Sequence, residues 1–283
     1  MNRNSIHCRR APAKINLGLW VGPKTADGYH PIDSVMHTIA LHDVLTIESS
    51  EQFEVLAADA DDIDPKSNLV TKAYHWLLQQ GADVPNIRVH LEKNIPIGAG
   101  LGGGSSDAAA IIRWGATSET IDIQKASRVG MDVPFFIRGG AARVRGYGEQ
   151  ITPLPDRHGE TVLLLNPGFE VSTEMVYDMY DLIDNHNDYA MDGLVQAWAR
   201  GELVDAWPNA LEPGAWLAYP ALRDFKEHVM RWLDDLSCHL SGSGGTYYCI
   251  GLDPERATWY AKRLRDQGIP WTQATHLVGA MNE

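Results

Sequence analysis

The sequence predicts a mixed α+β fold of two domains. Apolar residues recur at every second position in some segments and with the helical period in others, and the two kinds of segment alternate along the chain. With 283 residues, of which 44% are hydrophobic and 22% charged, the chain can bury a large core. A proline-rich and then polar stretch at 152–160 favours a boundary between a domain at 1–155 and a domain at 156–283.

Three strands and two helices are expected before this boundary. Alternating apolar residues predict strands at 15–19, 44–47 and 86–91. A helix is predicted over 67–80, because Asn68 can cap its start and Gly81 can end it. Another helix is predicted over 107–114, directly after a glycine-rich loop.

Two strands and three helices are expected beyond the boundary. The strands are predicted at 161–165 and 247–250, and the helices at 173–182, 191–199 and 220–235. A second glycine cluster, SGSGG at 241–245, precedes the last strand.

Composition excludes several classes of partner. A formal net charge of −13 argues against nucleic acid and anionic membrane surfaces. Cys8, Cys238 and Cys249 form no C-x-x-C pair, which fits a reduced cytoplasm, and no H-E-x-x-H motif indicates zinc. The apolar run after Arg9-Arg10 is short for an export signal, and no run approaches the ~18 apolar residues of a membrane helix. We therefore expect a cytoplasmic protein with neither nucleic-acid nor membrane partners.

The stretch GAGLGGGSSD at 98–107 has five glycines in seven positions and no lysine or arginine. Its G-x-G-x-x-G spacing, with Asp122 about twenty residues on, satisfies a dinucleotide fingerprint. However, the preceding segment contains a proline, and no Gly-Lys-Ser/Thr completes a Walker A loop. A tight turn from strand to helix remains an alternative. We favour phosphate binding, because consecutive amides and a helix N-terminus attract anions, and Ser105 and Ser106 offer hydroxyls to phosphate or Mg²⁺.

Five motifs carry a family resemblance. The segment 96–109, PIGAGLGGGSSDAA, resembles the phosphate loop of the GHMP kinases, which include galactokinase, homoserine kinase and mevalonate kinase. Its triple glycine and four further motifs, in the same order, are similar to those of one of their families, the 4-diphosphocytidyl-2-C-methyl-D-erythritol kinases. These motifs are APAKINL at 11–17, DGYH at 27–30, GMDVPFF at 130–136 and LSGSG at 240–244.

This resemblance implies a two-domain GHMP kinase fold. An N-terminal mixed α/β domain would carry the phosphate loop, a C-terminal α+β domain would follow, and the active site would lie in the cleft between them. The implied cofactors are ATP and Mg²⁺, and the implied acceptor is the 2-hydroxyl of the cytidine diphosphate-linked alcohol. The matching catalytic residues are Lys14 and Asp132, the aspartate accepting the hydroxyl proton while the lysine screens phosphate charge. Without their motifs, the pair would be interpreted as a surface ion pair.

The resemblance also implies a set of substrate-binding residues. Tyr29 would stack on the cytosine, His30 would hydrogen-bond its polar edge, and Tyr177 would close over the other face. Asn16 projects to the same strand face as the catalytic lysine and matches a substrate-binding asparagine. Gly242 would lie beside the substrate diphosphate, although its cluster could also be a plain hairpin turn.

The ATP side is expected to use the phosphate loop and two further residues. Asn68 and Lys93 fall where the family contacts adenosine, but a helix cap and a solvated strand lysine remain open for them. The full set of expected ATP-binding residues is Asn68, Lys93, Pro96, Ile97, Gly98, Ala99, Gly100, Leu101, Gly102, Gly103, Gly104, Ser105 and Ser106.

Some features depart from the family pattern or stay open. The segment 111–129 is short, so the helix after the phosphate loop should end near Gly115 and the next should be abbreviated. Asn209 stands in a motif whose aspartate is replaced by Ala210, and we expect it to be architectural. The nine tryptophans indicate either core or a partner surface.

Two other functions remain alternatives. A GHMP kinase for another small alcohol would not need the aromatic pair of Tyr29 and Tyr177, and a silent nucleotide-binding relative would not need Lys14 and Asp132. We expect a monomer or a weak homodimer.

Overall fold

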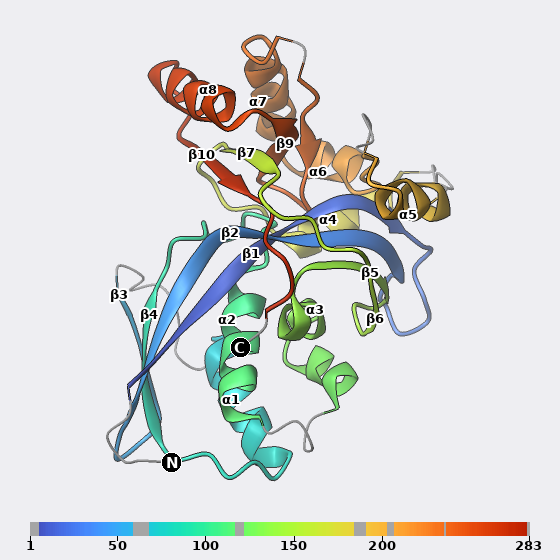
Figure 1. Ribbon diagram of the computed structural model, residues 1–283. Helices are drawn as coiled ribbons and strands as arrows, with labels where there is room; N and C mark the ends of the chain where they lie inside the picture. The colour runs from blue at the N-terminus through green and yellow to red at the C-terminus, as the bar shows by residue number, and fades with distance from the viewer. Residues whose placement is uncertain are drawn as a thin grey trace.

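Two long antiparallel strands, β1 (His7–Val21) and β2 (Ile32–Ser49), run side by side through the middle of the molecule (Figure 1). The computed structural model describes residues 6–58, 68–116, 122–183, 191–202, 207–234 and 236–281. Two irregularities of register, between Pro12 and Lys14 and between Asn16 and Gly18, interrupt the pairing of β1 with β2. Such bulges re-aim side chains, and here they flank the two polar residues of an otherwise buried segment.

The first sheet has six strands. Its order is β3-β4-β2-β5-β6, with β1 also paired to β2, and only β3 and β4 run parallel. Its remaining strands are β3 (Glu54–Ala58), β4 (Ile87–Glu92), β5 (Ala141–Gly146) and β6 (Gln150–Pro153). One face is covered by α1 (Leu69–Gln79), α2 (Gly103–Gly115), the 3₁₀ helix η1 (Ile123–Arg128) and α3 (Val133–Arg138) (Figure 1).

The second sheet has four antiparallel strands in the order β10-β7-β9-β8. They are β7 (Thr161–Asn166), β8 (His239–Leu240), β9 (Tyr247–Leu252) and β10 (Trp271–His276). The helices of this part are α4 (Thr173–Tyr180), α5 (Met191–Ala199), α6 (Glu212–Ala218), α7 (Pro220–Met230) and α8 (Pro254–Asp266). A buried cluster that includes Ile15, Leu17, Val162, Leu164 and Tyr248 joins the two sheets. The expected α+β fold is confirmed, and the division at residue 155 stays a prediction.

All predicted strands and helices exist, with some changes of length. The helix after the phosphate loop ends at Gly115, as expected, and a short 3₁₀ helix follows after the gap in the description. The helix predicted over 220–235 ends at Met230. Residues 67, 117–121 and 235, which the predictions included, lie outside the described residues.

The sequence analysis missed β1 outside 15–19, β2 outside 44–47, and all of α8, for identifiable reasons. Residues 11–19 of β1 are all buried, and buried polar residues such as His37 and Thr38 interrupt the apolar pattern of β2, so alternation fails there. The start of α8 did carry a readable signal, because Asp253 caps it and Pro254 occupies its first turn.

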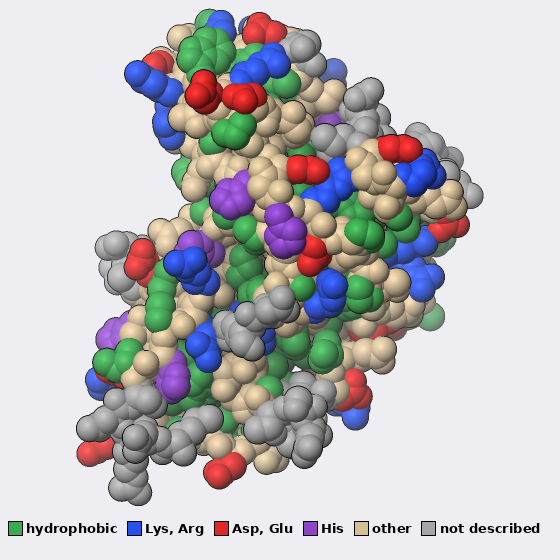
Figure 2. Space-filling model, viewed as in Figure 1, with side chains coloured by type: hydrophobic (Ala, Val, Ile, Leu, Met, Phe, Trp, Pro, Cys, Tyr) green, Lys and Arg blue, Asp and Glu red, His purple; other side chains and the backbone are tan. Residues whose placement is uncertain are grey.

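The structure also shows the environment of the cysteines, the tryptophans and the surface charges. The three cysteines are free. Trp198 and Trp207 belong to the core, whereas Trp259 is half exposed. No helix of the described ranges combines the length and apolarity needed to span a bilayer. On the face shown in Figure 2, acidic and basic side chains are interspersed.

Arg157 connects the segment before β7 to the end of α5. Its guanidinium stacks 3.8 Å from the centre of the Trp198 ring and donates to the carbonyl oxygens of Trp198 at 3.2 Å and Glu202 at 2.8 Å. Because the side chain is buried, its loss would remove the side-chain donor to the Glu202 carbonyl oxygen, whereas that of Trp198 still accepts from the backbone of Gly201 at 3.0 Å.

We expect Arg157→Leu to lower the free energy of unfolding by about 2–4 kcal/mol. The control is Arg200→Leu, because Arg200 is exposed and contacts the carboxylate of Glu202, a surface pair worth under about 1 kcal/mol. Urea unfolding of both variants checks the prediction. Equal losses in the two would contradict it.

Candidate active site

A cavity of about 1200 Å³ is lined by residues of both halves of the chain. With one exception, Ser106, every residue predicted from the sequence to bind ATP or substrate, or to catalyse transfer, lines it. The lining also includes residues that the sequence analysis did not single out, among them Asp107, Tyr147, Thr173 and Ser243.

The predicted phosphate loop leads into α2, and its glycines permit close packing. Gly100 has φ +73°, and a Cβ there would lie 2.3 Å from the carbonyl oxygen of Ser241. Gly102 has φ +72°, and a Cβ there would lie 2.7 Å from the ring of Phe136. The first amides of α2 have no partner within the helix, so they and the helix dipole face this end of the cavity as an anion-binding surface.

The two serines that follow the loop are placed differently. Ser105 lines the cavity. Ser106 is fully buried and its hydroxyl has no hydrogen-bond partner in the structure. Only Ser105 is therefore accessible to a phosphate oxygen or a Mg²⁺ ion.

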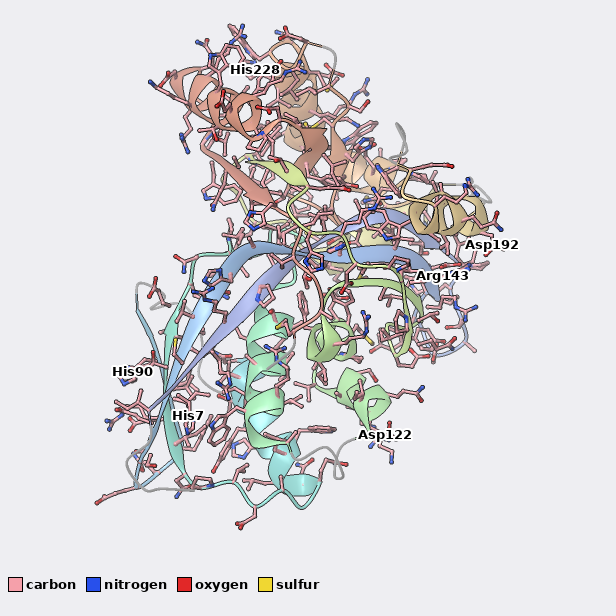
Figure 3. All side chains as sticks on the ribbon, viewed as in Figure 1. His7, His90, Asp122, Arg143, Asp192 and His228 are labelled. Atoms are coloured by element: carbon pink, nitrogen blue, oxygen red, sulfur yellow. The ribbon has the colours of Figure 1, made fainter. Side chains whose placement is uncertain are left out.

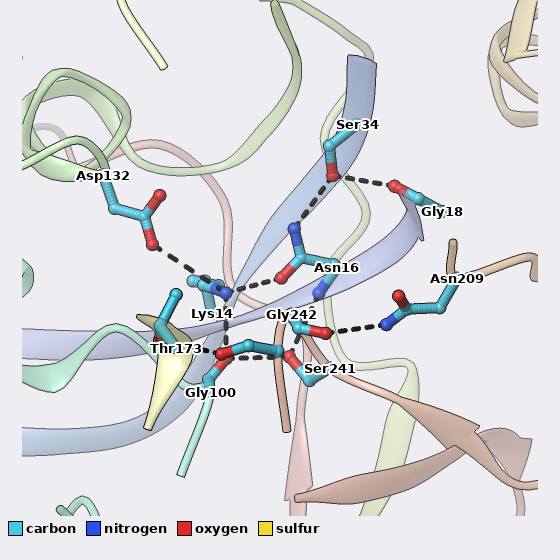
Figure 4. Close-up of polar contacts among 11 residues, drawn as sticks. Lys14, Asn16, Gly18, Ser34, Gly100, Asp132, Thr173, Asn209, Ser241 and Gly242 are labelled. Carbon is cyan, nitrogen blue, oxygen red and sulfur yellow. Dashed lines mark hydrogen bonds and ion pairs between the residues drawn. The ribbon is translucent and has the colours of Figure 1, made fainter. Parts of the chain in front are cut away.

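Lys14 is buried at the junction of the two glycine loops (Figure 4). Its ammonium donates to the side-chain oxygen of Asn16 and, at 2.8 Å, to the carbonyl oxygen of Gly100. The carboxylate of Asp132 lies 3.8 Å away. Burial lowers the pKa of Lys14, and the charge of Asp132 partly offsets this. The interpretation as a surface ion pair is wrong for this lysine.

Asn16 is held by a network around its amide and backbone. Its side-chain nitrogen donates to Ser34 Oγ at 2.9 Å, and Ser34 donates to the carbonyl oxygen of Gly18 at 2.7 Å (Figure 4). The backbone nitrogen of Asn16 donates to Ser241 Oγ at 3.3 Å, and Ser241 Oγ donates to the carbonyl oxygen of Gly100 at 3.0 Å. The network leaves the Asn16 amide in one orientation, with its oxygen toward Lys14.

Asn209 supports the second glycine loop. Its side-chain nitrogen donates to the carbonyl oxygens of Leu240 at 2.9 Å and Gly242 at 2.8 Å. Its side-chain oxygen accepts from the backbone of Leu211 at 2.9 Å. These contacts agree with the architectural role expected from the sequence.

Asp132 stands at the N-terminus of α3 but does not cap it. Its side chain makes no hydrogen bond to the backbone amides of the helix and is 26% exposed. Its carboxylate is therefore available to accept a proton or hydrogen bond from a molecule in the cavity.

Aromatic residues line the far end of the cavity. Tyr29 is 56% exposed, and Tyr177 packs 5.3 Å from the ring of His30. His30 is buried, with Nδ1 2.8 Å from the carbonyl oxygen of Gly22 and Nε2 3.0 Å from the carboxylate of Asp181. Both ring nitrogens thus contact protein groups. Recognition of a base edge by the His30 side chain, which would have to replace Asp181, stays a prediction.

The two residues predicted to contact adenosine also have structural partners. Asn68 caps α1, since its side-chain oxygen accepts from the backbone of Val70 at 2.8 Å. Lys93 is not a solvated strand lysine, because its side chain is 12% exposed and its ammonium pairs with Asp43 and with Asp107 at 2.8 Å. Asp43, which the sequence analysis missed, also accepts from the backbone of Asn94 and Ile95.

The dinucleotide alternative is not supported by the position of Asp122. Asp122 caps η1, pairs with Lys125 at 3.3 Å, and lies at the periphery of the molecule (Figure 3). It does not line the cavity. Among the described residues, no group of three or more His, Cys, Asp or Glu side chains could hold a metal ion.

The buried carboxyl group of Asp107, which pairs with Lys93, predicts that the free energy of unfolding depends on pH. Burial raises the pKa of Asp107 to about 8, with Lys93 opposing the shift and Asp43 adding to it. The unfolded chain releases this proton near pH 4, so between about pH 4 and 8 only the folded state keeps it. Stability should therefore fall as pH rises through this window, by up to about 1.4 kcal/mol per pH unit.

Asp107→Asn should remove that slope, because the amide resembles the protonated acid and does not titrate. Urea unfolding at several pH values between 5 and 9 measures it, with the exposed Asp224→Asn as the control. A variant whose stability falls as steeply as that of the unmodified protein would refute this assignment.

Comparisons with known proteins identify relatives of this chain in sequence and in structure. The family described as GHMP kinases N terminal domain matches residues 68–140. The 4-diphosphocytidyl-2-C-methyl-D-erythritol kinase of Persephonella marina is 33% identical over 253 residues, which cover 86% of this chain and 90% of the relative. That of Thermus thermophilus is 35% identical over 269 residues, covering 93% and 94%. A crystal structure of 4-(cytidine 5'-diphospho)-2C-methyl-D-erythritol kinase is similar with a TM-score of 0.78 and 34% identity, covering 96% of this chain and 100% of that one.

Proposed function

The chain belongs to the family of 4-diphosphocytidyl-2-C-methyl-D-erythritol kinases, and on this premise we propose that it transfers the γ-phosphoryl group of ATP to the 2-hydroxyl of 4-diphosphocytidyl-2-C-methyl-D-erythritol. This reaction is a step of the non-mevalonate route to isoprenoid precursors. Its setting in the cytoplasm, which the free cysteines support, and its state as a monomer or weak homodimer belong to the same proposal.

The observation that carries the proposal is the position of Lys14. Its ammonium touches the phosphate loop at Gly100 and lies 3.8 Å from Asp132. The buried ammonium of Lys14 thus lies beside both the loop predicted to bind the phosphate donor and the predicted base, Asp132. A phosphoryl transfer needs these two groups on either side of the transferred phosphorus.

The donor end fits the phosphates of ATP. Amides of the first turn of α2 supply hydrogen bonds to phosphate oxygens, and the Gly100 and Gly102 positions leave backbone rather than side chains on this surface. A Mg²⁺ ion bound with ATP and held by Ser105 would neutralise charge on the phosphate oxygens. Asn68 and Lys93 line the same end and would flank the adenosine.

The acceptor end fits a hydroxyl attached to a nucleoside diphosphate. Asp132 accepts the proton of the 2-hydroxyl as the oxygen attacks the phosphorus, and a loose transition state makes its position more important than its basicity. Lys14 screens the negative charge between carboxylate and phosphate. Asn16 and Gly242 lie beside the diphosphate, while Tyr29 and Tyr177 enclose the cytosine.

We expect Asp132→Asn to lower kcat about 10²- to 10⁴-fold, because the amide keeps the size of the side chain but cannot accept the proton. The KM for both substrates should change little. Steady-state ADP release measures these constants. Near-normal turnover of the variant would exclude Asp132 as the base.

A substrate panel tests the reaction itself. ADP release should occur with 4-diphosphocytidyl-2-C-methyl-D-erythritol and be absent with mevalonate and homoserine, because neither alcohol carries a base for Tyr29 and Tyr177 to enclose. CDP should compete with the acceptor. Turnover of mevalonate or homoserine at a comparable rate would instead support the alternative of another small-alcohol kinase.

A further inference from the structure

A third aromatic side chain, Tyr147, reaches the acceptor end of the cavity from the turn between β5 and β6. The turn is tight, because both neighbours of Tyr147 are glycines with positive φ, +72° at Gly146 and +108° at Gly148. The backbone nitrogen of Tyr147 donates to the carboxylate of Glu149 at 2.7 Å. A Cβ on Gly148 would lie 2.3 Å from the carbonyl oxygen of Met131, so the turn rests against the residue before Asp132.

Tyr147 contacts the turn that carries Tyr29 in two ways. Its ring meets the ring of Tyr29 edge-on, with centroids 6.1 Å apart and planes inclined by 66°. Its hydroxyl lies 3.1 Å from Thr25 Oγ1. Thr25 Oγ1 also donates to the carbonyl oxygen of Tyr29 at 2.7 Å or to the carboxylate of Asp27, and the Tyr147 hydroxyl lies 3.5 Å from the same carboxylate, so Tyr147, Thr25 and Asp27 form one hydrogen-bonded group.

These contacts restrict the side chain of Tyr29, which is otherwise free to move because it is exposed. A tyrosine that is 56% exposed on a turn loses side-chain freedom when a base stacks on it, and that loss weakens binding. An edge-on aromatic neighbour restricts the ring beforehand while leaving its other surface free. The hydrogen bond to Thr25 adds a second restraint, because Thr25 in turn holds the backbone of Tyr29 through its nitrogen, at 2.8 Å from the carbonyl oxygen.

We propose that Tyr147 is a positioning residue for recognition of the cytosine, acting through the ring of Tyr29 and the hydroxyl of Thr25. The inference rests on the proposed function, since it assigns the role of Tyr147 within the same acceptor site. Tyr147 preorganises the stacking surface and takes no part in phosphoryl transfer.

The experiment compares kinetic constants of Tyr147→Leu, Tyr147→Phe and the unmodified protein. Tyr147→Leu should raise the KM for 4-diphosphocytidyl-2-C-methyl-D-erythritol and the inhibition constant of CDP about three- to tenfold. The KM for ATP and kcat should stay within about twofold. Tyr147→Phe keeps the ring contact and loses the hydrogen bond, so its effect on both acceptor-site constants should be smaller.

A Tyr29→Ala background separates positioning from a general loss of structure. There, Tyr147→Leu should change the acceptor KM less than about twofold, because the ring that it positions is gone. Tyr74→Phe is the matched control, since its hydroxyl donates to Asn86 away from the cavity, and it should leave every constant unchanged.

Three outcomes would overturn the role of Tyr147 alone. They are equal changes in the KM of ATP and of the acceptor, an unchanged acceptor KM in Tyr147→Leu, and effects of Tyr147→Leu and Tyr29→Ala that add in the double variant. Absence of turnover by the unmodified protein would overturn the proposed function and this role together. If Tyr147→Leu does not fold, an acceptor KM unchanged in Tyr147→Phe, whose shape is conserved, overturns the hydrogen-bond part of the inference.

Discussion

The burial of one ammonium group, that of Lys14, fixes the centre of the structure. A buried cation is costly unless its donors are satisfied. The partners of Lys14 come from three elements: Asn16 from the bulged part of β1, Gly100 from the phosphate loop and Asp132 from the start of α3. Gly242 has φ +60°, and a Cβ there would lie 3.2 Å from the ammonium, so a side chain at this position would be strained and crowded. The contacts that the Lys14 ammonium needs therefore align four segments that are far apart in the sequence.

This arrangement also explains how a chain of net charge −13 can bind phosphates. The repulsion from distant carboxylates is screened within a Debye length of about 8–10 Å, whereas contacts inside the cavity act over shorter distances. In the proposed function, neutral amides at the start of α2 and one buried lysine would supply those contacts. Lys93 adds no free charge, because Asp43 and Asp107 already surround it. The donor end thus depends on directed hydrogen bonds rather than on a positive surface.

Sequence reasoning located cavity residues that belong to one motif, and it missed contacts that depend on tertiary structure. The glycine loop, Lys14 and Asp132 are recognisable because backbone conformation and chemistry restrict the residue types allowed there. Ser241 and Asp181 act only through residues more than 100 positions away, and no local pattern marks such a serine or aspartate. The solvated interpretation of Lys93 failed for the same reason, since Asp43 lies 50 positions earlier. Periodicity likewise found only 15–19 of β1, because residues 11–19 are buried on both faces.

The donor and acceptor ends of the cavity are linked by a backbone hydrogen bond as well as by Lys14. The carbonyl oxygen of Gly98, in the phosphate loop, accepts from the backbone of Val171 at 3.1 Å. A Cβ on Gly98 would lie 2.9 Å from the side chain of Glu170, so the two segments pack without space between them. Only two residues after Val171, α4 begins, and it carries Tyr177. A displacement of the phosphate loop at Gly98 must therefore move the start of α4, because close-packed segments transmit strain instead of absorbing it. The wall that would enclose the base and the loop that would hold the phosphates are thus parts of one packed unit.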